Sequence, residues 1–292
     1  MSDIENYIGN TPLVLIDEVG TNMIYGKLEG NNPAGSIKDR PAIRMIKDAE
    51  NSGLIKKGDT LIEATSGNTG IALAMAASIR GFKSKLIMPE TASIERIKTM
   101  RAYGAEVILV TKEQDMEGAR DLAIEMSNNG DGYILNQFSN KSNYLAHYDT
   151  TGPEIWTQTN EKITHFISAM GTTGTITGVS RYLKEKNNKI KIIGVQPTEG
   201  SRIPGIRRWK PEYVPEIFQQ AIVDQIIDIS QQDAEISMEH LSQSNGLFVG
   251  VSAGANVHIA KKIASELDNS IIVTILCDRG DRYLSKISST FT

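Results

Sequence analysis

The chain has 292 residues, 40% hydrophobic and 23% charged, and its 31 basic against 35 acidic residues give a net charge of -4. This length suits one or two α/β domains, and the acidic excess argues against a nucleic-acid partner, which requires basic residues gathered on one face. The single cysteine, Cys277, excludes an intramolecular disulfide. The polar, acidic N-terminal residues do not resemble a secretory signal, and no apolar run approaches the roughly 20 residues that span a bilayer, so we expect a soluble cytoplasmic protein without a membrane partner.

Short apolar runs alternate with helical patterns along the chain. In the first half we expect strands at 60–63, 85–88, 106–110 and 133–135, and helices at 71–80, 93–103 and 116–128. In the second half we expect strands at 165–168, 191–195 and 271–276, a helix at 175–186 and a helix N-cap at Ser230. This alternation predicts parallel sheets covered by helices, with ligands bound at the carboxyl ends of the strands. The proline-rich stretch 197–215 is expected to form a long functional loop.

The segment 32–40, Asn-Pro-Ala-Gly-Ser-Ile-Lys-Asp-Arg, places a lysine directly after a turn. Pro33 and Gly35 favour the turn, and Ser36 can cap the helix that follows. Lys38 would then meet the positive end of the helix dipole, which lowers its pKa and favours the neutral amine that forms a Schiff base. The alternative is an exposed lysine after a capped turn.

Two glycine-rich turns, 65–70 and 171–175, each separate a predicted strand from a predicted helix. Backbone N–H groups at a helix N-terminus bind anions, so the second turn suits a phosphate and the first a carboxylate. Neither turn has the lysine of a nucleotide-binding P-loop or the spacing of the dinucleotide fingerprint. For the first turn, the alternative is a glycine-rich packing turn.

Three further segments have both a functional and a structural interpretation. The turn 250–255 carries Ser252, which could instead cap a helix. The segment 277–283 follows the last predicted strand, and its Asp and Arg residues could simply form ion pairs. The two arginines beside a tryptophan in 204–209 could bind an anion or make surface salt bridges. The four histidines have neither metal-ligand nor triad spacing, so we expect no metal site.

Three segments in this order carry a joint resemblance to a known family: 32–40, 63–70 and 171–175. With them the chain resembles the fold-type II pyridoxal-phosphate (PLP) enzymes, and closely the O-acetylserine sulfhydrylases, or cysteine synthases. The resemblance runs from Ile8 to Ser285, nearly the whole chain. The segments 151–156, 204–209 and 277–283 resemble the B isozyme, which accepts thiosulfate as well as sulfide.

The resemblance implies a tryptophan synthase β-like fold of two three-layer α/β domains with mainly parallel sheets and an active-site cleft between them. The smaller, mobile domain would hold residues 1–10 plus 35–142, and the larger domain residues 11–34 plus 143–292. The implied reaction is PLP-dependent β-replacement on O-acetyl-L-serine, ping-pong through an α-aminoacrylate, as a step of cysteine biosynthesis. Sulfide would give L-cysteine and acetate, and thiosulfate would give S-sulfocysteine. A homodimer is implied, and binding of serine acetyltransferase is left open.

The resemblance also assigns roles to residues. Lys38 would hold PLP and move the substrate Cα proton. The other cofactor-binding residues would be Asn68 and Ser252 at the ring, and Gly171, Thr172, Thr173, Gly174 and Thr175 at the phosphate. The substrate carboxylate would be held by Thr65, Ser66, Gly67, Thr69 and Gln137. Arg207 and Cys277 would shape the sulfur-donor pocket.

Two alternatives keep the same cofactor anchors. A cystathionine β-synthase or a β-eliminating serine/threonine deaminase would use them for another reaction, and the pair Arg207 and Cys277 argues against both. A non-catalytic PLP-binding regulatory module is the other alternative. The simultaneous presence of Lys38, Asn68 and Ser252 argues against that module, because a scaffold without turnover does not need all three.

Overall fold

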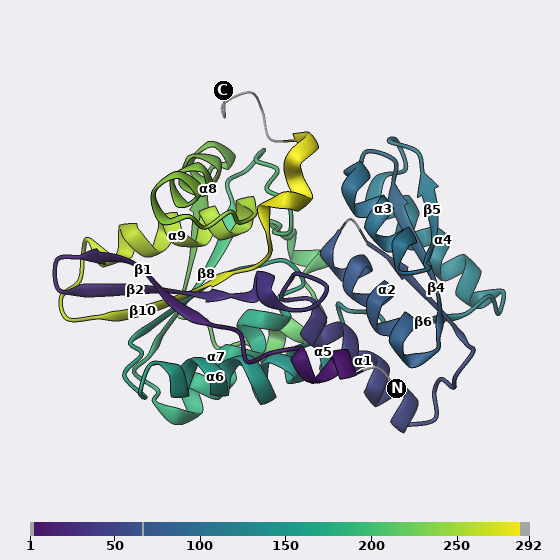
Figure 1. Ribbon diagram of the computed structural model, residues 1–292, viewed down its shortest axis with the longest axis horizontal. Helices are drawn as coiled ribbons and strands as arrows, with labels where there is room; N and C mark the ends of the chain where they lie inside the picture. Colours follow the sequence, from purple (N-terminus) through teal and green to yellow (C-terminus); the bar gives the residue numbers. More distant parts are fainter. Residues whose placement is uncertain (1–2, 66, 287–292) are drawn as a thin grey trace.

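Two β-sheets organise the chain in the computed structural model, which describes residues 3–65 and 67–286 (Figure 1). The large sheet has the spatial order β1 (Leu13–Val19), β2 (Asn22–Leu28), β10 (Ile271–Leu276), β7 (His165–Ala169), β8 (Lys191–Pro197) and β9 (Gln225–Ile229). The small sheet has the order β5 (Glu106–Val110), β4 (Lys83–Pro89), β3 (Thr60–Ala64) and β6 (Tyr133–Ile134). The hairpin β1/β2 is antiparallel, and the other strand pairs described are parallel.

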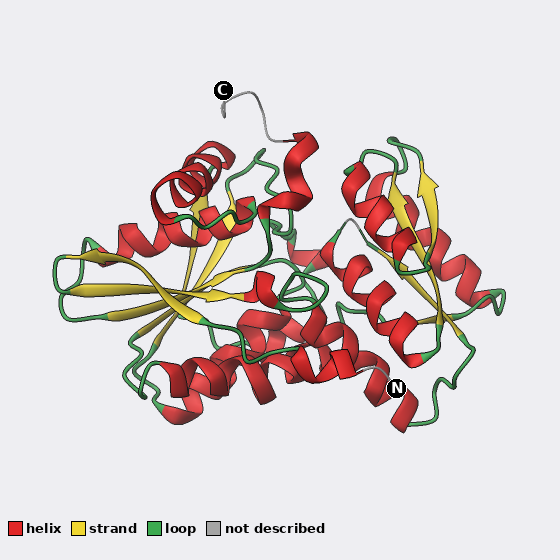
Figure 2. Ribbon diagram, in the orientation of Figure 1, coloured by secondary structure: helices red, strands yellow, loops and turns green. Residues whose placement is uncertain are grey.

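Helices cover both faces of each sheet, so each forms three layers (Figure 2). On the large sheet, α6 (Gly152–Gln158) and α7 (Gly174–Lys186) pack on one face, and α8 (Gln231–Asn245) and α9 (Val251–Ala264) on the other. On the small sheet, α2 (Asn68–Arg80) and α3 (Ile94–Ala102) lie opposite α4 (Asp115–Asn128). Between the sheets run α1 (Asp39–Asn51), α5 (Lys141–Ala146) and a π-helical turn, His147–Thr151. Short 3-10 turns occur at Asp3–Tyr7, Glu29–Asn31, Pro211–Tyr213, Glu216–Gln220 and Gly280–Lys286.

The strands and helices predicted from periodicity are confirmed, with ends within three residues of those expected. The N-cap at Ser230 is also confirmed, since its hydroxyl accepts a hydrogen bond from the Asp233 backbone at 3.1 Å. The hairpin β1/β2 and strand β9 were not predicted. In β2 the reason is a fully buried lysine, Lys27, which breaks the apolar pattern of a core strand.

The strands of the small sheet all come from residues 60–134, and those of the large sheet from residues 13–28 and 165–276. The domain boundaries at residues 10, 34 and 142 remain a prediction, because strand membership does not place the residues between the sheets. No helix in residues 3–65 and 67–286 is long and apolar enough to cross a bilayer. The same residues contain no group of three or more acidic, histidine or cysteine side chains placed to hold a metal ion.

A buried ion cluster fixes the start of α1 against the large sheet. Arg40 pairs with Glu29 at 2.7 Å and with Glu154 at 2.6 Å, and Lys27 pairs with Glu154 at 2.6 Å. Arg40, Glu29 and Lys27 are at most 2% exposed. The guanidinium of Arg40 holds the pKa of Glu29 below its usual value despite full burial, so the carboxylate stays ionised. The cluster therefore positions the helix that directly follows Lys38.

Candidate active site

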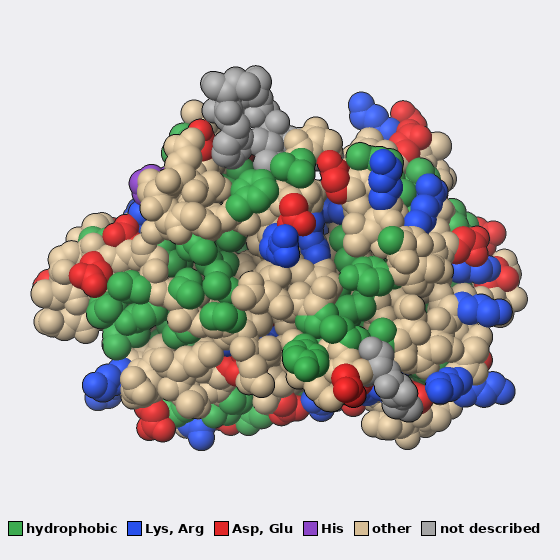
Figure 3. Space-filling model, in the orientation of Figure 1, with side chains coloured by type: hydrophobic (Ala, Val, Ile, Leu, Met, Phe, Trp, Pro, Cys, Tyr) green, Lys and Arg blue, Asp and Glu red, His purple; other side chains and the backbone are tan. Residues whose placement is uncertain are grey.

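A cleft of about 1290 Å³ lies where the carboxyl ends of the two sheets face each other. Its walls include Thr65 after β3, Pro89 at the end of β4, Ala169 at the end of β7, Pro197 at the end of β8 and Cys277 after β10. Figure 3 shows lysine, arginine and acidic side chains together at the junction between the two halves of the molecule. The cleft occupies the place where parallel α/β sheets bind ligands.

Lys38 lines this cleft at the residue before α1. The Ser36 hydroxyl accepts a hydrogen bond from the Lys38 backbone at 3.2 Å, and the Ile37 backbone donates to the Cys277 carbonyl at 2.9 Å. The pKa of Lys38 is lowered mainly by burial, against the opposing effects of Cys277 and Asp278. The expected lowering is therefore present, and its largest cause is desolvation. The alternative of an exposed surface lysine is wrong.

The turn 171–175 joins β7 to α7 and presents the N-terminus of a 13-residue helix to the cleft. Thr173 has a left-handed backbone, with φ of 68°, and its buried hydroxyl has no hydrogen-bond partner among the described residues. A Cβ added to Gly174 would overlap the Asn143 amide, and one added to Gly171 would overlap the Gly205 carbonyl. A phosphate group fits this turn, because the turn offers the N–H groups at the start of α7, the Thr173 hydroxyl and two closely packed glycines.

Ser252 is the second residue of α9, whose N-cap is Gly250, so the interpretation of Ser252 as a helix cap is wrong. It is 4% exposed and lines the cleft. Burial raises the pKa of the Cys277 thiol to about 12, although a hydrogen bond with Ser252 acts in the opposite direction. The thiol is therefore neutral at physiological pH and can be a hydrogen-bonding group, not a thiolate nucleophile.

Asn68 begins α2 and is held by residues more than 200 positions later. Its Nδ2 donates to Asp278 Oδ2 at 2.6 Å, and its Oδ1 accepts from Arg282 Nη1 at 2.6 Å. The Tyr283 hydroxyl also donates to Asp278 Oδ2 at 2.6 Å. The segment after β10 thus reaches the small-sheet side of the cleft. Among the described residues, the alternative of simple ion pairing in 277–283 holds for Arg279 with Asp281, at 3.3 Å.

The predicted carboxylate-binding residues gather around the first turn of α2. The Thr65 hydroxyl accepts hydrogen bonds from the Gly67 and Gly70 backbones at 3.3 and 3.1 Å. The Thr69 hydroxyl donates to Gln137 Oε1 at 2.9 Å, across the space between α2 and the segment after β6. Thr65, Gly67, Thr69 and Gln137 all line the cleft. Ser66, predicted in the same group, lies outside the described residues.

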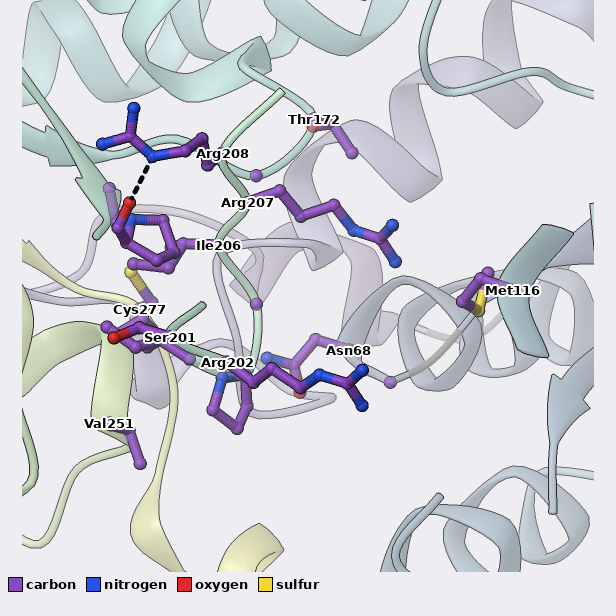
Figure 4. Close-up of a pocket in the computed structure, with 18 of the residues that line it drawn as sticks. Asn68, Met116, Thr172, Ser201, Arg202, Ile206, Arg207, Arg208, Val251 and Cys277 are labelled. Atoms are coloured by element: carbon purple, nitrogen blue, oxygen red, sulfur yellow. Dashed lines mark hydrogen bonds between the residues drawn. The ribbon is translucent and has the colours of Figure 1, made fainter. Parts of the chain in front are cut away.

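The two neighbouring arginines of the long loop point in opposite directions (Figure 4). Arg208 donates to the Pro197 carbonyl at 2.9 Å and pairs with Asp228, as the surface interpretation expects. Arg207 lies over the Trp209 ring at 5.6 Å and points toward Met116 at the start of α4. Trp209 in turn donates to the Gly171 carbonyl at 2.9 Å. This loop therefore connects the glycine-rich turn 171–175 to the guanidinium of Arg207, which is directed across the cleft.

Four charged residues at or beside the cleft have no role predicted from the sequence: Glu63, Asp278, Arg120 and Arg202. Asp278 carries no local signal for this place, because its partner Asn68 lies 210 positions earlier. Glu63 did leave a signal, a carboxylate in an otherwise apolar strand, and it accepts a hydrogen bond from Gln137 Nε2 at 3.2 Å.

Comparison with known proteins agrees with this geometry. The family model described as "Pyridoxal-phosphate dependent enzyme" matches residues 4–278. Cysteine synthase B of Escherichia coli is 59% identical over 98% of this chain and 95% of its own length, and that of Pseudomonas aeruginosa is 57% identical over 97% and 95%. The crystal structure of O-acetyl serine sulfhydrylase isoform 3 from Entamoeba histolytica superposes with a TM-score of 0.91 at 35% identity, covering 99% of this chain and 92% of that one.

The chain belongs to the family of pyridoxal-phosphate-dependent enzymes. Within that family, 57–59% identity over nearly its whole length places it in the cysteine synthase group, with the B enzymes among its relatives. The residues present fit the cofactor of the family, since a lysine of lowered pKa and a glycine-rich helix N-terminus share one cleft.

Proposed function

We propose that this protein is a cysteine synthase that replaces the β-acetoxy group of O-acetyl-L-serine with a sulfur nucleophile. The observation that carries the proposal is the convergence in one cleft of Lys38, the turn 171–175 and the Thr65–Thr69 turn. These supply an amine, a phosphate cradle and a carboxylate cradle, which are the three groups that a PLP enzyme acting on an amino acid requires. The cysteine synthase relatives support the choice of reaction.

The cofactor would be held at both ends. The turn 171–175 would hold its phosphate, Lys38 would bind its aldehyde carbon through Nζ, and Asn68 and Ser252 would hydrogen-bond its ring. When bound, PLP supplies an electron sink for the substrate Cα. Ser252 is neutral and cannot stabilise a positive ring nitrogen as a carboxylate does. The site therefore favours elimination over transamination. In that elimination a good leaving group departs as the proton is removed.

The chain's own residues would perform three tasks. Thr65, Thr69 and Gln137 would orient the substrate carboxylate at the start of α2, whose N-cap is Gly67. Lys38 Nζ, whose lowered pKa favours the neutral amine, would take the proton from the substrate Cα. Arg207 and the neutral Cys277 thiol would line the place where the sulfur donor enters.

We further infer that thiosulfate is accepted as a donor beside sulfide. Arg207 points into the cleft and would pair with the dianion, whereas Arg208 is engaged with the Pro197 carbonyl and Asp228. The matched pair of variants Arg207→Ala and Arg208→Ala tests this. We expect Arg207→Ala to lower kcat/KM for thiosulfate at least about ten times as much as it lowers kcat/KM for sulfide. The reason is that a charge-assisted hydrogen bond is worth about that factor. Equal losses with both donors, or equal effects of both variants, would remove Arg207 from this role.

A visible absorption spectrum tests the reaction itself. The band of the bound cofactor should change when O-acetylserine is added and return when sulfide or thiosulfate follows, which is the order of a ping-pong reaction. Lys38→Ala should lose this cycle while still binding PLP through the turn 171–175. A protein that binds PLP but leaves O-acetylserine intact would point to the non-catalytic module, and full activity of Lys38→Ala would refute its catalytic assignment. Product analysis with homocysteine separates the cystathionine β-synthase alternative.

The homodimer and the cytoplasmic location stay proposals that follow from the resemblance and the relatives. Light scattering of the purified holoenzyme gives the oligomeric state, and the same measurement with serine acetyltransferase added shows whether a complex forms. Cell fractionation gives the location.

A further inference from the structure

Three buried polar residues form a hydrogen-bond chain behind the proposed carboxylate site. Glu63 on β3, Gln137 after β6 and Thr69 on α2 are 4%, 5% and 8% exposed. Figure 1 shows α2 and β6 close together in the half of the molecule that holds the small sheet. Because Thr69 and Gln137 line the cleft while Glu63 does not, the chain connects the cleft to a carboxyl group inside the protein.

The direction of the hydrogen bonds limits what Thr69 can do. The Thr69 hydroxyl donates to Gln137 Oε1 at 2.9 Å, and Gln137 Nε2 donates to Glu63 Oε1 at 3.2 Å. A hydroxyl has a single proton, so in this arrangement Thr69 has none left to donate to a substrate carboxylate. A carboxylate accepts hydrogen bonds and donates none, so this direction is unfavourable for its binding at Thr69.

A proton on Glu63 reverses the chain. A protonated Glu63 can donate its O–H to the carbonyl of Gln137 once that amide turns over. The Gln137 N–H₂ group then donates to Thr69, and the Thr69 proton becomes free to face the cleft. The only species added is one proton from solvent, which resides on Glu63. No proton passes along the chain.

Glu63 is placed so that both protonation states are within reach near neutral pH. Burial raises its pKa to about 7, against the lowering effects of Gln137, the Asn136 backbone amide and Arg120. Its second oxygen has no hydrogen-bond partner among the described residues. Arg120 on α4 is a charged side chain that lowers the pKa of Glu63, while α2 contributes the neutral Thr69 and β4 the apolar Leu86 beside it in register.

We propose that Glu63 is a positioning residue that sets the direction of the hydrogen bonds through Gln137 to Thr69, so that binding of the substrate carboxylate is accompanied by proton uptake at Glu63. This inference rests on the proposed function, because it takes Thr69 and Gln137 to be the carboxylate site. Proton uptake on binding means that affinity is highest below the pKa of free Glu63 and falls as the pH rises through it.

The test uses the PLP-loaded enzyme and L-lactate as the probe. L-Lactate has a carboxylate and no amine, so it neither reacts with the cofactor nor titrates near pH 7. Calorimetry at pH 7 in two buffers of different ionisation enthalpy counts the protons taken up. If the reversed chain adds one hydrogen bond worth about tenfold in affinity, uptake at pH 7 should be about 0.4 proton per lactate. The affinity should then fall about fivefold between pH 6 and pH 8.

Glu63→Gln is permanently neutral, so its lactate affinity should not depend on pH and its proton uptake should vanish. Glu106→Gln, which removes an exposed carboxylate of the same sheet, is the matched control and should behave like wild type. If Glu63→Gln does not fold, Gln137→Met breaks the chain at its middle and should reduce the uptake. A merely structural role of Glu63 would change stability but not the proton count.

Two outcomes overturn the inference in distinguishable ways. Lactate binding by wild type without proton uptake, or with the same uptake in Glu63→Gln, refutes the role of Glu63 and leaves the carboxylate site intact. Lactate that does not bind, or that binds as well to Thr69→Val, refutes the carboxylate site itself and with it the assignment in the proposed function.

Discussion

Replacing Arg40 by methionine removes the central cation of the buried ion cluster beside Lys38 while keeping a long apolar side chain. Arg40 donates to both oxygens of Glu29, at 2.8 and 2.7 Å, and to both oxygens of Glu154, at 2.6 and 2.8 Å. In Arg40→Met, Glu154 keeps Lys27 at 2.6 Å, but Glu29 is left buried without its cation. The variant therefore isolates the effect of one buried carboxylate that keeps its hydrogen bonds from Thr11 and Asn32 but loses its ion pair.

The size of the effect follows from the protonation of Glu29. A carboxylate with an ordinary pKa of 4.5 in the unfolded chain can avoid a buried charge by taking up a proton. At pH 7 that proton costs about 3.4 kcal/mol, since each unit between the pKa and the pH is worth about 1.36 kcal/mol. Leaving it ionised costs about 3–5 kcal/mol. We thus expect Arg40→Met to lower the free energy of unfolding by about 3–4 kcal/mol at pH 7.

The sign of the pH dependence provides a second check. In wild type the pKa of Glu29 is lowered, so its contribution is constant above the unfolded value and is lost only in acid. In the variant its pKa is raised, so the folded state binds a proton that the unfolded state lacks. The destabilisation should therefore grow by up to about 1.4 kcal/mol per pH unit between pH 6 and pH 8.

Urea unfolding of the holoenzyme, followed by circular dichroism at pH 6, 7 and 8, measures these quantities. The matched control is Arg44→Met, one helical turn further along α1, whose 33% exposed side chain pairs with Asp48 and Asp149 at 2.7 Å. Surface pairs of this kind contribute about 0–1 kcal/mol. A loss below about 1 kcal/mol for Arg40→Met that does not vary with pH, or an equal loss for both variants, would refute the reasoning.

Three further predictions concern packing, cofactor binding and pH. Gly178→Ala should lose about 1–3 kcal/mol in urea unfolding, because the new methyl group would overlap the backbone of α5; an unchanged midpoint would contradict this close approach. Asn143→Ala should weaken PLP binding about tenfold in a fluorescence titration, since its amide supports the Thr172 hydroxyl at 3.3 Å and the carbonyl of residue 137 at 2.6 Å. If Asn143→Ala bound PLP with the affinity of wild type, this support would not be needed. Burial raises the pKa of Asp39 to about 7, so wild type should lose up to about 4 kcal/mol of stability relative to Asp39→Asn as the pH rises from 4 to 7. Parallel pH profiles of the two proteins would contradict this.

The elements that bear the site could be predicted from the sequence because their signals are local. A strand–turn–helix unit is recognised by a change of hydrophobic period within a few residues, and the glycine-rich turn 171–175 lies at such a change. The turn before Lys38 is recognised by its proline, glycine and serine. Jointly these segments also carried the family resemblance. The buried lysine of β2 could not be predicted, since its partners Glu154 and Gln158 are more than 120 residues away.

The sequence by itself determined most of the parallel strands of both sheets, the turn before Lys38 and the two glycine-rich turns, because each depends on residues close together in the chain. Only the tertiary structure decided that Asn68 is held by Asp278 and Arg282, that Arg207 faces the cleft while Arg208 turns away, and that Glu63 ends a buried hydrogen-bond chain. These facts depend on contacts between distant segments and on burial. A pKa or a side-chain direction is set by what surrounds the group in space, which a local pattern does not encode.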